Sequence, residues 1–227
     1  MTDTVRPPRE GVGEEFSLAK MVRARDLTFE AIGKIAPAIQ PGMTEAEAHD
    51  HAQGVLEAMG MDRLWHKNIV RFGEGTMEIF SALMEPERVL GENDIYFLDL
   101  GVVWDGHEGD AGDTFVVGED AEMKACAQAA RDLWREVAGR WRDDGLTGDG
   151  LYEFAKARAE AMGWTLNWDV KGHRVSDFPH AIYKAGDLGD LETCPQTGLW
   201  ILEIQLAHKT RPFGAFYEDL LIGETVV

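Results

Sequence analysis

A strand-like apolar run holds a carboxylate: Ile95-Tyr96-Phe97-Leu98-Asp99-Leu100-Gly101-Val102-Val103-Trp104, with Asp99 in its middle. Two later runs share this feature; they are Leu199-Trp200-Ile201-Leu202-Glu203-Ile204-Gln205-Leu206, which holds Glu203, and Phe216-Tyr217-Glu218-Asp219-Leu220-Leu221-Ile222, which holds Glu218. A buried carboxylate without a partner takes up a proton rather than stay charged, and none of the three runs contains Lys or Arg. Hydrogen bonds from neighbouring backbone are the ordinary solution for a single buried carboxylate. A bound metal would satisfy all three at once.

The spacing of other residues adds a fourth carboxylate and an imidazole. Asp110 follows Asp99 by eleven residues, and Asp105-Gly106 between them is typical of a tight hairpin turn. Because a hairpin folds its strands back on each other, Asp99 and Asp110 can face one point. His173 lies between this hairpin and the later runs. Four carboxylates and one imidazole are too many for a tetrahedral structural zinc site. They suit two divalent ions bridged by shared carboxylates, and an oxygen-rich set favours Mn, Fe or Co, with Zn left open.

Hydrophobic periodicity predicts helices over 15–37, 44–60, 120–142 and 149–162, and strands over 68–72, 94–104, 111–117, 165–168, 198–207 and 214–223. Two short matches recur at one offset of 103 residues (145 − 42 and 160 − 57): Gly42-Met43-Thr44 with Gly145-Leu146-Thr147, and Glu57-Ala58-Met59-Gly60 with Glu160-Ala161-Met162-Gly163. This favours an internal duplication, with two α/β halves around a pseudo-two-fold axis and a site between them. We expect residues 1–13 to form a flexible tail and residues 14–227 to form a single domain.

Composition excludes some classes of partner. The chain has 227 residues, of which 22 are basic and 41 acidic, so its net charge is −19. This charge argues against binding to nucleic acid or to an anionic membrane, both of which need basic patches. The N-terminus has no apolar signal core and no apolar run approaches membrane-spanning length, so we expect a cytoplasmic protein. The two cysteines suggest no disulfide framework.

The pattern Asp99-Leu100-Gly101, Asp105-Gly106 and Asp110 resembles the first metal motif of the pita-bread metallopeptidases, a family that includes methionine aminopeptidase, aminopeptidase P and prolidase. The five ligand types occur in the family's order, Asp, Asp, His, Glu, Glu. The resemblance covers about residue 15 to the end and implies an α+β pita-bread fold, with two pseudo-symmetric α/β halves around a central antiparallel sheet. Prolidase-like members have an additional N-terminal domain, so this chain resembles the catalytic domain alone.

The resemblance also implies roles for individual residues. Asp99 would chelate one metal ion, His173 and Glu203 would hold the other, and Asp110 and Glu218 would bridge both. Glu203 would handle the proton of the attacking water, and His180 would contact the substrate. The implied protein is a dinuclear metal-dependent hydrolase, a peptidase that cleaves an N-terminal or Xaa-Pro amide bond with two Mn, Co, Fe or Zn ions. Its substrate would be a small peptide or a small-molecule amide. A homodimer is one option for its oligomeric state.

The chain departs from the family pattern at three places. The family's His-Gly-x-Gly is His173-Arg174-Val175-Ser176 here, and its Glu-Pro is Glu203-Ile204. A first substrate histidine, expected at residues 80–82, is absent. These changes motivate an alternative in which the same fold and metals perform non-peptide small-molecule hydrolysis or lyase chemistry. A second alternative is a non-catalytic binding module, against which the retention of all five ligand types argues.

Four further residues allow two interpretations each. His66 could line the pocket as a displaced substrate residue, but we expect it to be structural or superficial. His107 follows the hairpin turn near Asp110 and could reach the site, but we expect it at the surface. Arg174 could bind a substrate carboxylate, but we expect it to pair with one of the many acids. Trp65 could wall a substrate pocket, although most of the tryptophans have the apolar neighbours of core residues.

Overall fold

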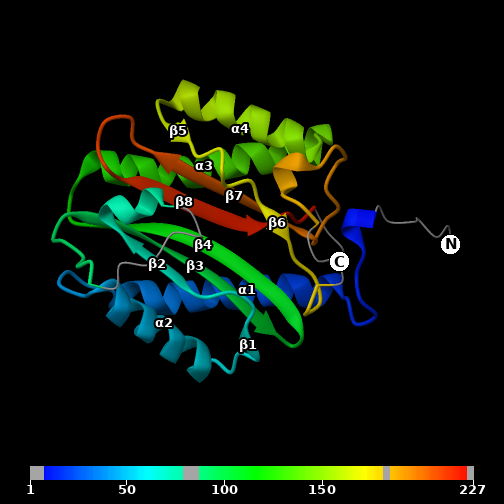
Figure 1. Ribbon diagram of the computed structural model, residues 1–227, viewed down its shortest axis with the longest axis horizontal. Coiled ribbons are helices and arrows are strands. Elements are labelled where there is room, and N and C mark those ends of the chain that lie inside the picture. Colours follow the sequence, from blue (N-terminus) through cyan, green and yellow to red (C-terminus); the bar gives the residue numbers. More distant parts are fainter. Residues whose placement is uncertain (1–7, 79–86, 181–184, 224–227) are drawn as a thin grey trace.

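A single curved sheet runs through both halves of the computed structural model, which describes residues 8–78, 87–180 and 185–223. In these residues the sheet has eight strands in the order β1-β3-β4-β8-β7-β5, with β2 also paired to β3 and β6 to β7. Every ladder is antiparallel. Helices α1 and α2 lie along the β3–β4 half, and α3 lies along the β7–β8 half with α4 beside it (Figure 1).

The predicted elements all occur in the described residues. The helices are α1 (Leu18–Ile35), α2 (Glu45–Ala58), α3 (Ala121–Asp144) and α4 (Gly148–Met162). The strands are β1 (Arg63–Leu64), β2 (Ile69–Phe72), β3 (Asp94–Trp104), β4 (His107–Val117), β5 (Thr165–Leu166), β6 (His173–Arg174), β7 (Trp200–Ala207) and β8 (Gly214–Leu220). Short 3-10 turns are η1 (Pro8–Glu10), η2 (Ala36–Ala38), η3 (Gly73–Met77) and η4 (Leu188–Asp190). Strand β4 begins earlier than predicted because the turn at Asp105-Gly106 uses only two residues, both with positive φ (46° and 71°).

The repeated sequence matches fall at equivalent helix ends. Thr44 is the N-cap of α2 and makes a capping box with Glu47, while Thr147 is the N-cap of α4. The last residues of the second match, Gly60 and Gly163, both have positive φ, 81° and 93°, just after their helices. Only glycine adopts this conformation freely, so the same physical requirement preserves the same residue in both halves.

Alternation along the strands separates the apolar core from the polar residues of the sheet. Leu98, Leu100 and Val102 of β3 belong to the core formed with α1 and α2. In the other half, Leu202, Ile204 and Leu206 of β7 belong to the core formed with α3 and α4. Because successive side chains of a strand point to opposite faces, Asp99 and Glu203 lie on the face away from the helices.

The segment before α1 differs from the predicted flexible tail. Residues 8–10 form η1, and the fully buried Glu10 accepts hydrogen bonds from the Trp200 indole at 2.7 Å and from the Gln196 backbone N–H at 2.8 Å. The Gly13 backbone N–H donates to Asp177 at 2.9 Å. The prediction is therefore wrong for residues 8–13, because a buried carboxylate fastens this segment to β7; residues 1–7 lie outside the described ranges.

Candidate metal centre

Strand register places three of the predicted ligands in one row across the sheet. Asp99 of β3 pairs with Gly112 of β4, Gly112 pairs with Glu218 of β8, and Glu218 pairs with Glu203 of β7. Directly paired residues share a face, so the three carboxylates project from the same side of four adjacent strands. Gly112 has no side chain to fill the row; a Cβ there would lie 2.5 Å from the Phe216 ring and 3.0 Å from Glu218 Oε1.

A second row, one step along the strands, supplies Asp110 and His173. Asp110 pairs with Gly101 in the β3–β4 hairpin, and His173 of β6 pairs with Ile201 of β7. Asp110 Oδ2 lies 2.9 Å from His173 Nε2. The prediction that the hairpin brings Asp99 and Asp110 to one point is confirmed, because an oxygen of each carboxylate lies within 3.4 Å of the same imidazole nitrogen, Nε2 of His66.

Burial makes the carboxylates of the centre reluctant to ionise. Asp110 and Glu218 are each 1% exposed. Burial raises the pKa of Glu218 well above its ordinary value, and the neighbouring Asp110 and Asp99 raise it further. Burial likewise raises the pKa of Asp99 to about 6 and that of Glu203 to about 7. Four carboxylates with this environment need positive charge from a partner.

Asp110 is the exception, because two imidazoles face it. Burial raises the pKa of Asp110, but hydrogen bonds from His173 and His66 lower it more, so the net shift is downward. The pKa of His173 rises to about 10, since the Asp110 hydrogen bond and charge outweigh the lowering effect of burial. The pKa of His66 rises to about 9, because Asp99 and Asp110 outweigh burial in the same way.

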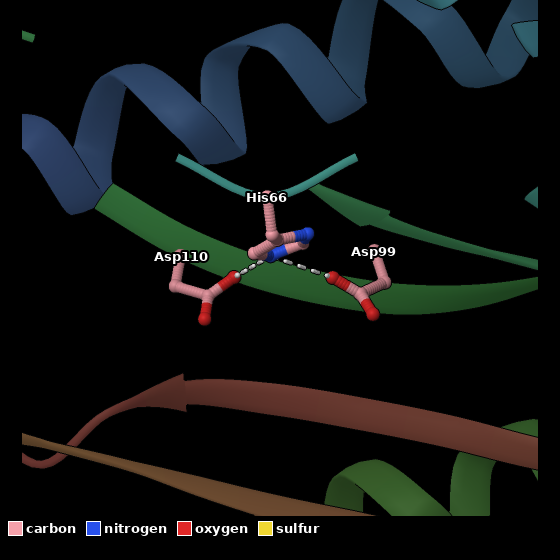
Figure 2. A group of neighbouring side chains, drawn as sticks. All are labelled: His66, Asp99 and Asp110. Carbon is pink, nitrogen blue, oxygen red and sulfur yellow. Dashed lines mark hydrogen bonds and ion pairs between the residues drawn. The ribbon is translucent and has the colours of Figure 1, made fainter. Parts of the chain in front are cut away.

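His66 lies in the centre with its side chain only 10% exposed, so the expectation that it is superficial is wrong. Its Nε2 lies 3.4 Å from Asp99 Oδ1 and 3.3 Å from Asp110 Oδ1, as Figure 2 shows. The sequence signal was indirect. Gly101 interrupts a buried strand two residues after Asp99, and such a glycine often marks the close approach of another group.

The donor set fits divalent metal ions. Two groups of side chains bring ligand atoms within 4.8 Å of one another: His66, Asp99 and Asp110, and Asp110, His173 and Glu218. Within the described residues, Asp99 Oδ1 and Glu218 Oε1 are buried and accept no hydrogen bond. Buried oxygens without donors are costly unless a cation is bound. Glu203 completes the surroundings, with its Oε2 accepting from the Gly172 backbone N–H at 2.8 Å.

His180, predicted to contact substrate, packs against Trp65, and its ring is oriented by a carboxylate that the sequence did not single out. Its Nδ1 lies 2.8 Å from Oε2 of Glu108, which is 2% exposed. Glu108 also accepts the backbone N–H groups of Ser176 at 2.9 Å and of His180 itself at 3.2 Å. The His180 ring meets Trp65 edge-on with centroids 6.3 Å apart. Glu108 thus fastens the loop after β6 to the strand that holds Asp110.

Two other expectations are corrected. His107 is 1% exposed rather than superficial; its Nε2 accepts the Ser17 backbone N–H at 3.0 Å and its Nδ1 lies 2.9 Å from the Asp105 carbonyl oxygen. Arg174 is 3% exposed, and its guanidinium donates to backbone carbonyls, among them those of Leu199 at 2.6 Å and Gly11 at 2.7 Å. Arg174 therefore has a structural role in holding the N-terminal segment.

A cavity of about 340 Å³ opens onto the centre. Asp99, His173, Glu203 and Glu218 line it together with His66 and Trp65. Its remaining lining comes from the segment before His173 and from η4: Asp169, Val170, Lys171, Gly172 and Asp187. Trp65 lines this cavity, which agrees with the alternative that it walls a pocket. Residues 80–82, where the family resemblance places a substrate histidine, lie outside the described ranges.

Comparisons with known proteins agree with this geometry. A model of metallopeptidase family M24 matches residues 19–219. Methionine aminopeptidase A of Synechocystis sp. is 26% identical over 171 residues, which are 72% of this chain and 66% of that protein. The chain therefore spans about two thirds of that curated relative's length.

Solved structures share the fold at lower sequence identity. The X-Pro aminopeptidase of Thermotoga maritima has a TM-score of 0.75 and 18% identity, with 95% of this chain and 61% of that chain covered. The methionine aminopeptidase of the same organism has a TM-score of 0.73 and 20% identity, with 97% and 96% covered. The predicted α+β pita-bread fold is confirmed. Within the described residues no helix is both long and apolar enough to cross a membrane.

Proposed function

Because this chain belongs to metallopeptidase family M24, we propose that it is a metal-dependent peptidase that binds two divalent ions and cleaves an amide bond at the N-terminus of a small peptide or next to proline. The observation that supports this most is the buried row of carboxylates that line the cavity, in which Glu218 Oε1 accepts no hydrogen bond from the described residues. A structural role for four buried acids would require more cationic partners than the two imidazoles that face Asp110.

Asp99, Asp110, His173, Glu203 and Glu218 would hold the ions, with Asp110 central to both groups of donors. When bound, divalent ions polarise the scissile carbonyl and acidify the attacking water. Glu203 would accept the water's proton and return it to the leaving amine. One of its oxygens is already held by the Gly172 N–H, so the carboxylate keeps its orientation during proton transfer.

The charges around the cavity fit a small peptide. Asp169 and Asp187 offer carboxylates to an amino terminus. Lys171 offers an ammonium group that lies 4.8 Å over the Trp168 ring and 3.4 Å from Asp190. Both signs of charge at one opening suit a substrate with a free amino end and a nearby carboxylate. His180 would donate to the substrate carbonyl, with Glu108 holding its ring.

A second candidate keeps the metal centre but acts on a non-peptide amide or performs lyase chemistry. Arg174 favours this second candidate. It replaces a glycine of the family motif, and its guanidinium binds the carbonyls of the N-terminal segment, whereas glycine would leave the backbone after His173 uncovered. A third candidate, a binding module without activity, conflicts with the intact ligand set.

A dipeptide panel separates the candidates. Xaa-Pro and Met-Xaa dipeptides, each assayed with Mn, Co, Fe and Zn, should show turnover that depends on the added metal. Metal binding without turnover of any dipeptide would favour the non-peptide candidate or the binding module. Turnover of a small amide would then separate these two.

A further inference from the structure

His66 is held over the centre by the segment that links β1 to β2. Both strands pair with β3, and the Trp65 backbone N–H donates to the Gly101 carbonyl at 3.0 Å. The segment therefore crosses Gly101, where a Cβ would lie 1.9 Å from Cδ2 of the His66 ring. Trp65 packs edge-on against this ring with centroids 4.5 Å apart. The ring is thus fixed between a tryptophan and a glycine.

The two ring nitrogens of His66 have different surroundings. Nδ1 lies 2.8 Å from the Lys67 carbonyl oxygen. A carbonyl can only accept, so Nδ1 holds the hydrogen, and in the neutral ring Nε2 keeps its lone pair. That lone pair is directed at the carboxylates of Asp99 and Asp110 (Figure 2). Histidines that bind metals generally donate their other ring N–H to a carbonyl or carboxylate in this way.

His173, the expected ligand, has the same arrangement on the opposite side of Asp110. Its Nδ1 lies 3.1 Å from the Arg174 carbonyl oxygen, and its Nε2 lies 2.9 Å from Asp110 Oδ2. His66 Nε2 faces the other oxygen of the same carboxylate, Oδ1. Asp110 therefore lies between two imidazoles that are oriented alike, and each imidazole belongs to one of the two groups of donor atoms.

We propose that His66 is a metal ligand, which supplies an imidazole nitrogen to the ion held by Asp99 and Asp110. This inference rests on the proposed function, since it requires the metal centre. Each of the two ions then has one nitrogen donor, from His66 and His173 respectively. Imidazole suits Zn and Fe, whereas carboxylate oxygens suit Mn, so the site beside His66 should discriminate against Mn.

Two other roles for His66 predict different results. If His66 is a counter-charge that neutralises Asp99 and Asp110 in the absence of metal, its removal should leave metal affinity unchanged or increase it. If it contacts only substrate, its removal should lower turnover and leave metal binding intact. Metal affinity therefore separates ligation from both alternatives without relying on activity.

The test is a titration of the full chain with Zn²⁺ and Co²⁺ in competition with a chromophoric chelator. The wild type is compared with His66→Ala, with His66→Gln, which keeps a polar side chain of similar reach, and with His173→Ala. His49→Ala is the matched control, because this histidine lies on α2 and pairs only loosely with Asp50, at 3.6 Å. Thermal melting of each variant verifies that it is folded.

We expect two ions per wild-type and His49→Ala chain. One of the two should bind at least about tenfold to a hundredfold more weakly in both His66 variants, as for losses at metal sites generally. His173→Ala should lower the affinity for the other ion. Unchanged affinity for both ions in either folded His66 variant would overturn the ligand role while leaving the proposed function standing. A wild type that binds no metal would overturn the proposed function as well.

Discussion

Replacing Gly101 by alanine should weaken metal binding, although Gly101 is not itself a metal ligand. The new Cβ would lie 1.9 Å from His66 Cδ2 and 2.2 Å from its Nε2, whereas ordinary van der Waals contact begins near 3.4 Å. The ring must therefore move by about 1.5 Å (3.4 − 1.9). Metal sites tolerate displacements of only about 0.2 Å in ligand distance. We expect Gly101→Ala to lower the affinity for one of the two ions by at least about tenfold.

The same substitution should also cost stability, because Trp65 packs edge-on against the His66 ring and limits its movement. Overpacking of this kind costs about 1–3 kcal/mol. Gly54→Ala is the control: Gly54 lies inside α2 with no atom within 4 Å of the added Cβ, so alanine should stabilise the helix by about 0.5–1 kcal/mol. The assays are chelator competition and thermal melting. Wild-type affinity for both ions in folded Gly101→Ala would refute the role assigned to this close approach.

Three further predictions concern catalysis and pH. Glu203→Gln should lower turnover at least about a hundredfold at matched metal occupancy, and unchanged turnover would remove Glu203 from the mechanism. His180→Ala should leave metal content intact while lowering turnover about tenfold to a thousandfold. A variant that loses thermal stability together with activity would indicate a purely structural role. Burial raises the pKa of Asp99 to about 6 and of Glu203 to about 7 in the metal-free protein. A carboxyl group with a raised folded pKa stabilises the fold below its unfolded pKa, and this contribution is lost as the pH rises through the folded pKa. Chelated protein should therefore melt at progressively lower temperature from about pH 4 to about pH 7, and metal-loaded protein should not. A melting temperature of chelated protein that rises over this range would contradict the electrostatic account.

Much of the fold was readable from the sequence because its signals are local. Thr44 with Glu47 specifies a helix start, and Asp105-Gly106 specifies a two-residue hairpin turn. The apolar run around Asp99 predicts a buried strand, and all residues of β3 after Asp94 are buried. Asp99, Glu218 and Glu203 come together because β3, β4, β8 and β7 pair side by side, which is an order that the family resemblance implied only as a central antiparallel sheet.

The residues whose surroundings were not predicted make contacts with distant segments of the chain. His66 reaches the centre because β1 and β2 both pair with β3, a topology that no local pattern around Trp65 indicates. Arg174 is occupied by the carbonyls of residues 9 and 11, more than 160 positions away. No local sequence pattern marks Glu108, because its partner, His180, lies 72 residues later.

The most direct measurement is the metal content of the purified, reconstituted protein by elemental analysis, for the wild type and for Asp110→Ala and Glu218→Ala. We expect close to two divalent ions per wild-type chain, and loss of most of this capacity in both variants, because Asp110 belongs to both groups of donor atoms and Glu218 Oε1 is a buried oxygen without a hydrogen bond in the described residues. A wild-type protein without stoichiometric metal, or variants that retain two ions, would contradict the dinuclear centre.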